Sequence, residues 1–256
     1  MLEIEVKASF INYLRKRNNR FSDGVIVNEF VYDNFNRRAD LLYIKGNRLF
    51  AYEIKSEADS LSRLPGQIDN YLGHFDKVIM VVATKHVGAV LDMTPSVVEV
   101  IEIKPEGNFK IIRRGKISKN IESRKLLNLL KVKEIRQVAK KIGVSTHQNT
   151  KKTLIDELSC FKSNKLKGYI IQSISQRFTY SSSAFNLICG GRDVVKDDLN
   201  ILSNNKKENK VDNIFLDKKN NCEDKKMLEM QRYSKHPIFG KVPSIVLDIL
   251  KERDDQ

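Results

Sequence analysis

Three charged residues interrupt a stretch that otherwise has the apolar character of two buried strands. In RRADLLYIKGNRLFAYEIKSEAD (residues 37–59), Asp40 stands at the start of the first apolar run, and Glu53 and Lys55 stand near the end of the second. Carboxylates and ammonium groups are poor choices for a buried strand, because an unpaired charge is costly there. These residue types at this spacing therefore need a chemical explanation.

The pair Gly46-Asn47 separates the two runs and is typical of a tight hairpin turn. Counting back from that turn places Asp40 opposite residue 53 or 54, so Asp40 and Glu53 are expected to be near cross-strand neighbours. Glu53 and Lys55 are two residues apart and share one face of their strand. Two adjacent carboxylates suit Mg²⁺, and a nearby lysine can orient or deprotonate a water. Together they fit metal-assisted attack of water on a phosphodiester.

The Glu-x-Lys pattern alone carries no weight, because an exposed strand or helix face explains it equally well. The chain contains the pattern five times, beginning at Glu5, Glu53, Glu102, Glu208 and Glu223. The copy at Glu53 differs because it follows a strand that carries a facing aspartate, Asp40. The combination of the three charges, rather than Glu-x-Lys, indicates a site.

Residues 1–115 have the pattern of a mixed α/β sheet flanked by helices. A first helix is predicted over 3–17 from apolar positions at helical spacing, which are Ile4, Ala8, Ile11 and Leu14. Pro65 predicts the start of another helix that runs to about residue 75. Strands are predicted at VIVNEFVY (25–32), ADLLYIK (39–45), LFAYEIK (49–55), VIMVVA (78–83), VVEVIEI (97–103) and NFKIIRR (108–114). With a short helix over 86–93, the order is α-β-β-β-α-β, then α-β-β.

This arrangement resembles the PD-(D/E)XK nuclease superfamily. Asp40 followed by Glu53-Ile54-Lys55 is similar to its D…(D/E)xK core, and the α-β-β-β-α-β order is similar to its restriction-endonuclease-like fold. The chain departs from the pattern at Ala39, where many members have proline.

The helix after the motif extends the resemblance. Gln67-x-x-x-Tyr71 is similar to the QxxxY element of RecB-like members, and EIKSEADSLSRLPGQIDNYLGHFDKVIMV resembles a bacterial and phage-associated group of the superfamily. The resemblance covers about residues 1–115.

The resemblance implies roles for individual residues. Asp40 and Glu53 would bind Mg²⁺ or Mn²⁺, with the backbone carbonyl of Ile54 as a further ligand, and Lys55 would position the attacking water. Glu5, on the first helix, matches an acidic position that many members place beside the metal. An ordinary solvated helix charge is the alternative for Glu5.

Four further residues are candidates for contacts with the substrate. Gln67 and Tyr71 lie one helical turn apart on the same face and would contact the scissile phosphate or the substrate strand. For Tyr71, a core position in an amphipathic helix is the alternative. Arg38 and Arg63 are candidate phosphate contacts. Surface solvation explains Arg38 equally well, and an i,i+4 ion pair with Asp59 is the alternative for Arg63.

The net charge of +14 is concentrated in one segment. Residues 1–115 contain 17 basic and 15 acidic residues, residues 116–178 contain 15 and 4, and residues 179–256 contain 14 and 13. A general lysine bias would raise the charge everywhere, whereas the lysine-rich C-terminal part is nearly neutral. The middle segment is therefore expected to bind a polyanion, because neutralised phosphates release counterions.

These observations predict three regions. A nuclease-like domain occupies 1–115, a basic and mostly helical nucleic-acid-binding region occupies 116–178, and a mixed region occupies 179–256. The last region is expected to contain a polar linker over about 203–226 and a short amphipathic helix around SIVLDILKER (244–253).

Residues 125–160 predict two amphipathic helices separated by the polar stretch GVSTHQNTKK. The apolar stripes are Leu129, Val132, Ile135, Val138 and Ile142, then Leu154, Ile155 and Leu158. The candidate nucleic-acid contacts on the outer face are Lys133, Arg136, Lys140, Lys141, Lys151 and Lys152. This pattern resembles the SAP-type helix–loop–helix DNA-binding module, and the alternative is a basic helical hairpin that packs on the α/β domain. Both allow backbone contacts without sequence specificity.

Composition argues against several other classes. Cys160, Cys189 and Cys222 stand singly, so a zinc ribbon or disulfide framework is not expected, and the histidines show no metal-ligand spacing. No run of about 18 apolar residues predicts a membrane span, and MLEIEVKASF lacks the apolar core of a secretory signal. A reducing cytoplasm is the expected location.

We therefore expect a metal-dependent nuclease that hydrolyses phosphodiester bonds of DNA, with RNA left open as a substrate, in a repair or phage-related role. One alternative is a nuclease-fold protein that binds nucleic acid without cutting it. The intact set of Asp40, Glu53 and Lys55 argues against this, since a non-cleaving protein has no chemical reason to keep all three. The other alternative is a basic protein that binds an acidic protein partner.

Overall fold

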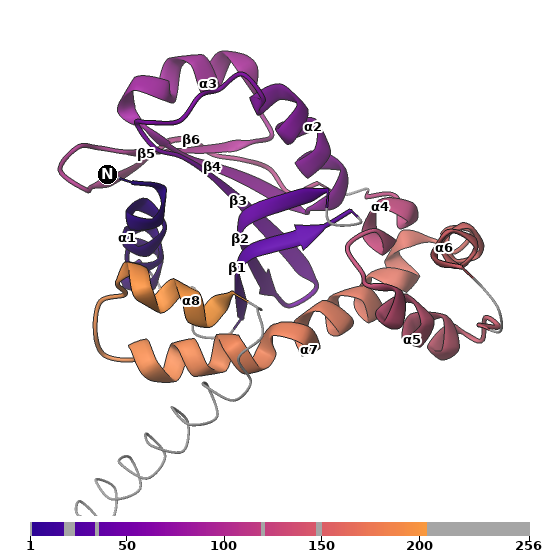
Figure 1. The fold of residues 1–256 in the computed structure, drawn as a ribbon. Helices are drawn as coiled ribbons and strands as arrows, with labels where there is room; N and C mark the ends of the chain where they lie inside the picture. Colours follow the sequence, from indigo (N-terminus) through magenta and orange to yellow (C-terminus); the bar gives the residue numbers. More distant parts are fainter. Residues whose placement is uncertain (1, 18–23, 34–35, 119–120, 147–149, 204–256) are drawn as a thin grey trace, which may run out of the picture. The chain divides into compact units, whose positions relative to one another are not determined.

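A computed structural model describes residues 2–17, 24–33, 36–118, 121–146 and 150–203. Its centre is a six-stranded sheet with the strand order β1-β2-β3-β4-β5-β6 (Figure 1). The strands are β1 (Val25–Tyr32), β2 (Arg37–Lys45), β3 (Arg48–Lys55), β4 (Lys77–Ala83), β5 (Glu99–Ile103) and β6 (Phe109–Arg113). β3, β4 and β5 run parallel, and the other neighbours are antiparallel. The predicted α/β class and mixed sheet are confirmed.

The β2–β3 hairpin forms around the predicted turn. Gly46 has a φ of 55°, in the left-handed region that glycine adopts without a steric penalty. Pairing continues from Lys45 opposite Arg48 to Leu41 opposite Tyr52. This register fixes which side chains of the two strands can meet.

Helices cover both faces of the sheet (Figure 1). One apolar core joins the sheet to α1 (Glu3–Lys16), to the C-terminal end of α7 (Ser163–Cys189) and to α8 (Leu199–Leu202). The other core joins the opposite face to α2 (Leu64–His74) and α3 (Val87–Met93), and it continues into the helical region that follows β6. The predicted site residues lie where α1 and α2 approach β2 and β3.

α1 has nearly the predicted bounds, and three of its four predicted apolar positions, Ala8, Ile11 and Leu14, are buried. Ile4 is 40% exposed, whereas Val6 and Phe10 are buried together with Ile11 and Leu14. The helix therefore presents to the sheet a face that also contains Lys7.

The helical region contains α4 (Ser123–Leu127), α5 (Val132–Ile142) and α6 (Lys151–Ser159). Gly143 ends α5 in the left-handed conformation, and the Thr150 side chain caps the start of α6. The predicted apolar stripes are confirmed in their main members, because Ile135, Val138, Leu154 and Leu158 are all buried. These helices share the core of the α2 face, so they pack on the α/β domain.

α7 links the helical region to the sheet. It runs beside the edge strand β1 (Figure 1), where the backbone N–H of Ile26 donates a 3.0 Å hydrogen bond to Ser182 Oγ. The predicted boundary at residue 178 lies inside this helix, and the described residues belong to one compact unit, Met1–Asn205. Apart from Ser203, the predicted linker over 203–226 lies outside the described residues, as does the predicted helix over 244–253. In the described part of the chain, no helix has both the length and the apolar character needed to span a membrane.

Candidate active site

Asp40 on β2 and Glu53 on β3 face each other in the sheet. Leu41 and Tyr52 form the final pair of the β2–β3 ladder, and one further step in the same register brings Asp40 opposite Glu53. Both side chains belong to buried residues, which are 9% and 3% exposed. The backbone N–H of Ile54 donates a 2.7 Å hydrogen bond to Asp40 Oδ2. The predicted cross-strand relation of the two carboxylates is confirmed.

Three predicted site residues converge on Glu53. Lys55 Nζ is 2.7 Å from Glu53 Oε1, and Gln67 Nε2 donates to the same oxygen at 2.9 Å. The Tyr71 hydroxyl donates to Glu53 Oε2 at 2.5 Å and also lies 2.9 Å from the carbonyl oxygen of Arg38. Tyr71 is 2% exposed, so it is a core residue and a partner of Glu53 at once.

The electrostatics of the pair follow from burial and like charge. Burial raises the pKa of Asp40 well above its ordinary value, and the charge of Glu53 raises it further, although Lys7 and the N–H of Ile54 act in the opposite direction. Burial also raises the pKa of Tyr71, with further contributions from the charges of Glu53 and Asp40. Burial is the largest cause of both shifts and neighbouring negative charge adds to it, so each group holds its proton more strongly than usual in the absence of a cation.

A cavity of about 630 Å³ opens at this position. All five residues with predicted catalytic roles line it, together with Ile54, Arg38 and Arg63. Its further lining includes Glu3, Tyr32, Asn36, Arg37, Asp59 and Asn70. The cavity lining therefore combines four acidic with four basic residues, which are Glu3, Asp40, Glu53 and Asp59, then Arg37, Arg38, Lys55 and Arg63.

The two predicted phosphate contacts differ in their surroundings. Arg38 is exposed, and its Nε lies 2.5 Å from Glu29 Oε2. Arg63 is exposed at the start of α2. The Asp59 carboxylate accepts hydrogen bonds from the N–H and hydroxyl of Ser56, and no Asp59–Arg63 ion pair is found among the described residues. The alternative explanation for Arg63 is therefore not supported.

On α1, the structure places Glu3 rather than Glu5 at the site. Glu5 accepts a 2.9 Å hydrogen bond from the backbone N–H of Leu2 and does not line the cavity, whereas Glu3 does. Two residues of an α-helix correspond to a rotation of about 200°, so the two acids point in nearly opposite directions. Glu5 caps the start of α1. The position beside the cavity that was predicted for Glu5 is occupied by Glu3.

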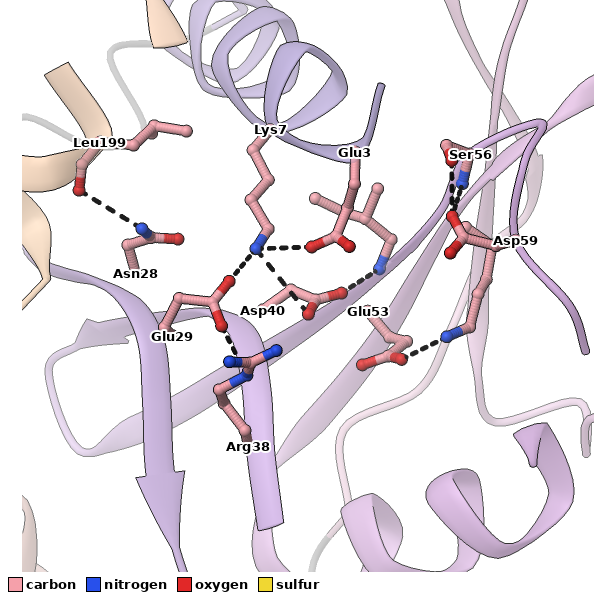
Figure 2. A network of polar contacts seen from close by, with 12 residues as sticks. Glu3, Lys7, Asn28, Glu29, Arg38, Asp40, Glu53, Ser56, Asp59 and Leu199 are labelled. Carbon is pink, nitrogen blue, oxygen red and sulfur yellow. Dashed lines mark hydrogen bonds and ion pairs between the residues drawn. The ribbon is translucent and has the colours of Figure 1, made fainter. Parts of the chain in front are cut away.

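The sequence interpretation missed Lys7 and Glu29. Lys7 is 3% exposed, and its ammonium contacts the carboxylates of Glu3, Glu29 and Asp40 (Figure 2). Burial lowers the pKa of Lys7, but the three carboxylates outweigh burial, so the pKa is raised and the ammonium is charged.

A sequence signal existed for one of these two residues. Lys7 precedes Ile11 by four residues and Leu14 by seven, so a lysine stands on the buried stripe of an amphipathic helix. Glu29 lies opposite Asp40, between the pairs Asn28–Leu41 and Phe30–Ala39. Its φ of 57° is unusual for a strand residue, and no residue type in VIVNEFVY predicts it.

The donor set is chemically compatible with a hard divalent cation. Asp40 and Glu53 supply carboxylate oxygens beside an open cavity. Asp40 Oδ2 and Glu53 Oε2 each accept one hydrogen bond and retain a lone pair, whereas Glu53 Oε1 already accepts from Lys55 and Gln67. The pKa of Asp40 is raised mainly by burial and further by the charge of Glu53, so a bound cation would stabilise the ionised pair. Asp40 and Glu53 are the residues that could hold Mg²⁺ or Mn²⁺, with Ile54 adjacent.

The predicted basic surface forms on α5 and α6. Lys133, Arg136, Lys140, Lys141 and Lys152 are exposed, whereas Lys151 is partly buried. Lys141 also donates a 3.0 Å hydrogen bond to Gln172 on α7. We call these six residues the α5–α6 basic surface.

The helical region contacts the chain just after β1. Burial lowers the pKa of Lys151, while the negative charge of Asp33 acts on it in the opposite direction. The N–H of Asp33 also donates a 3.2 Å hydrogen bond to the carbonyl of Asn128, just after α4. Since Asn36 and Arg37 line the cavity, the helical region approaches the same β1–β2 connection that borders the site.

Comparison with known proteins gives the family. The family model described as bacteriophage P4 protein cII matches residues 1–203. Protein cII of Enterobacteria phage P4 is 34% identical over 215 residues, which cover 81% of this chain and 80% of the relative. The chain belongs to the bacteriophage P4 protein cII family.

One solved structure shows a distant likeness. The SPO1766 protein of unknown function from Silicibacter pomeroyi is 18% identical, covers 58% of this chain and 98% of its own, and has a TM-score of 0.38. A likeness at this TM-score is too weak to support an argument about fold or function.

Proposed function

We propose that this protein is a Mg²⁺- or Mn²⁺-dependent nuclease that hydrolyses phosphodiester bonds of DNA. The observation that carries the proposal is the convergence of Asp40, Glu53 and Lys55 at one open cavity, with two carboxylates buried side by side on adjacent strands. Two carboxylates buried side by side at a solvent-accessible cavity are more typical of a functional site than of a structural one.

The element order supports a finer proposal for the fold. α1, β1, β2, β3, α2 and β4 follow each other as α-β-β-β-α-β, with the site at the β2–β3 hairpin and the first residues of α2. We assign this part to the restriction-endonuclease-like core of the PD-(D/E)XK superfamily.

Each side chain has a role that follows from its contacts. Asp40 and Glu53 would hold the ion, which when bound supplies an acidified water and neutralises phosphate charge. Gln67 and Tyr71 orient Glu53 by bonding its two oxygens, and Lys55 holds positive charge 2.7 Å from Glu53 Oε1. Lys55 is then placed to position the attacking water. By resemblance to the superfamily, the product would carry a 5′-phosphate.

The arginines and the α5–α6 basic surface would hold the nucleic acid. Arg37, Arg38 and Arg63 line the cavity, where they can contact phosphates on either side of the scissile bond. The basic surface offers further backbone contacts, which provide affinity without sequence readout. This arrangement fits the predicted SAP-like role of the helical region.

A specific observation also favours the non-cleaving alternative. Both oxygens of Glu53 already accept hydrogen bonds, and the exposed lysines of α5 could bind DNA without any contribution from the cavity. A protein that binds nucleic acid through this surface alone would show salt-sensitive affinity and no strand scission.

The two functions are separated by incubating the protein with supercoiled plasmid and with single-stranded DNA, each in Mg²⁺, Mn²⁺ or chelator. The nuclease proposal predicts cleavage with metal and none with chelator, and it predicts product ends that DNA ligase accepts without a kinase. A gel shift of both DNAs without cleavage under any metal condition would instead support the binding protein.

A further inference from the structure

The ammonium group of Lys7 lies among three carboxylates beside the proposed site (Figure 2). Glu3, Glu29 and Asp40 each offer an oxygen within 4.8 Å of the others. Lys7 Nζ is 2.7 Å from Glu3 Oε1 and 3.9 Å from Asp40 Oδ1, and it donates a hydrogen bond to Glu29 Oε1. The Lys7 side chain is 4% exposed, so its charge is held inside the protein.

The three acids come from three different elements. Glu3 belongs to α1, Glu29 to β1 and Asp40 to β2, so the fold rather than local sequence brings them together. Glu29 joins the group with its backbone in the left-handed region, which is unfavourable for a residue other than glycine. The surrounding structure therefore stabilises an unfavourable conformation that leaves the Glu29 carboxylate in contact with Lys7.

Three carboxylates around one point form a ligand set typical of a hard divalent cation. In this protein the point is occupied by an ammonium group that the chain itself supplies. Asp40 belongs to this group through Oδ1 and accepts from the N–H of Ile54 through Oδ2. One acid thus connects the Lys7 group to the carboxylate pair with Glu53.

We propose that the Lys7 ammonium takes the place of a second divalent cation and so limits the site to one ion. The inference rests on the proposed function, in which Asp40 and Glu53 hold that ion. Lys7 is a positioning residue: it forms ion pairs with Glu3 and Glu29 and holds one side of Asp40. Without its charge, Glu3, Glu29 and Asp40 would form a second cation site.

A simpler role for Lys7 is to attach α1 to the sheet by ion pairs. Val6, Phe10, Ile11 and Leu14 are buried on the same helix and already provide that attachment. The two roles predict different results when the charge is removed. Attachment alone predicts a loss of stability with no change in the number of bound ions, whereas our inference predicts a change in that number.

The test counts bound Mn²⁺ per protein by electron paramagnetic resonance, which detects the free ion and needs no substrate. The proteins are the wild type, Lys7→Met, Lys7→Arg and Lys7→Met/Glu29→Gln. Lys16→Met is the matched control, because Lys16 lies on the same helix and is 70% exposed. We expect one ion for the wild type, Lys7→Arg and Lys16→Met, two for Lys7→Met, and one again for Lys7→Met/Glu29→Gln.

The outcomes separate this inference from the function on which it rests. Two ions in the wild type, or one ion in Lys7→Met, would overturn the inference and leave the Asp40–Glu53 metal site standing. No bound ion in the wild type would overturn both. If Lys7→Met is unfolded without metal, the inference requires that Mn²⁺ restores its far-ultraviolet circular dichroism with two ions bound. Failure of saturating Mn²⁺ to do so would contradict it.

Discussion

The hydroxyl of Tyr71 on α2 donates a hydrogen bond to Glu53 on β3, and the ring of Tyr71 packs in the core between that helix and the sheet. A helix that follows the hairpin by nine residues thus fixes the orientation of a carboxylate inside the sheet. Gln67, one turn earlier on the same helix, bonds the other oxygen of Glu53. The packing of α2 on the sheet therefore sets the orientation of Glu53, a proposed metal ligand.

Removing these orienting groups should weaken activity without abolishing it. We expect Gln67→Ala and Tyr71→Phe each to lower metal affinity or cleavage by about 10–100-fold, the usual effect of losing a partner of a metal ligand. Tyr71→Phe should also lower the free energy of unfolding by about 1–2 kcal/mol, because a buried carboxylate oxygen loses its donor. Mn²⁺ titration and thermal unfolding measure the two effects. Tyr180→Phe, at an exposed position of α7, is the control for both.

Lys55 should be needed for cleavage but not for metal binding. In Lys55→Ala we expect at least about 100-fold slower cleavage, since a positioned charge near the attacking water is removed. The affinity for Mn²⁺ should be unchanged or higher, because Glu53 loses a competing cation 2.7 Å away. Single-turnover cleavage and Mn²⁺ titration separate the two quantities, with Lys85→Ala as an exposed control. A strong loss of Mn²⁺ binding in Lys55→Ala would contradict the role assigned to Lys55.

The raised pKa of Asp40 predicts how stability depends on pH. The folded protein keeps a proton on Asp40 at pH values where the unfolded chain has released it, because the folded-state pKa lies above the ordinary value near 3.9. The unfolding free energy should therefore fall as pH rises from that value through the folded-state pKa. Asp40→Asn has no such proton to lose, so its stability should change less with pH.

Denaturant unfolding of both proteins between about pH 5 and pH 8, in chelator, measures this difference. We expect Asp40→Asn to be more stable at the upper end by roughly 1–3 kcal/mol, since a buried carboxylate beside the charge of Glu53 is removed. Mn²⁺ should stabilise the wild type at that pH and leave Asp40→Asn nearly unchanged. Equal dependence of stability on pH in the two proteins would contradict a raised pKa of Asp40 in the folded state.

The α5–α6 basic surface should contribute affinity for DNA independently of catalysis. Replacing Lys133, Arg136 and Lys140 by alanine should weaken duplex binding equally for unrelated sequences. The slope of log affinity against log salt should become shallower by about 0.9 for each phosphate that the variant no longer neutralises. Fluorescence anisotropy over a salt series in chelator measures both. Lys104→Ala/Lys110→Ala, which removes exposed charge near the β5–β6 turn, is the control.

The sequence predicted the parts of this structure that depend on local patterns. Gly46-Asn47 fixed the hairpin, and the hairpin fixed the register that brings Asp40 opposite Glu53. The spacing of Gln67 and Tyr71 placed both on one helix face, and both meet Glu53. These relations follow from the two-residue period of strands and the 3.6-residue period of helices, which can be recognised in a single sequence.

Features that depend on how helices and strands pack in three dimensions could not be predicted from these local patterns. The choice between Glu3 and Glu5 depends on how α1 is rotated over the sheet, and the apolar pattern suggested Ile4 as a buried residue when it is 40% exposed. The role of Glu29 depends on a backbone conformation that its residue type disfavours. The continuous α7 crosses residue 178, where the change in charge suggested a boundary, because helix continuity does not follow charge.

The most direct test compares plasmid cleavage by the wild type, Glu53→Gln and Glu57→Gln in Mg²⁺ and in chelator. Glu57 is exposed just after β3 and does not line the site cavity, so it matches the change in charge without touching the carboxylate pair. We expect the wild type and Glu57→Gln to cut only with Mg²⁺, and folded Glu53→Gln to be at least about 100-fold slower. Undiminished cleavage by Glu53→Gln, or wild-type cleavage that persists in chelator, would contradict the proposed metal-dependent site.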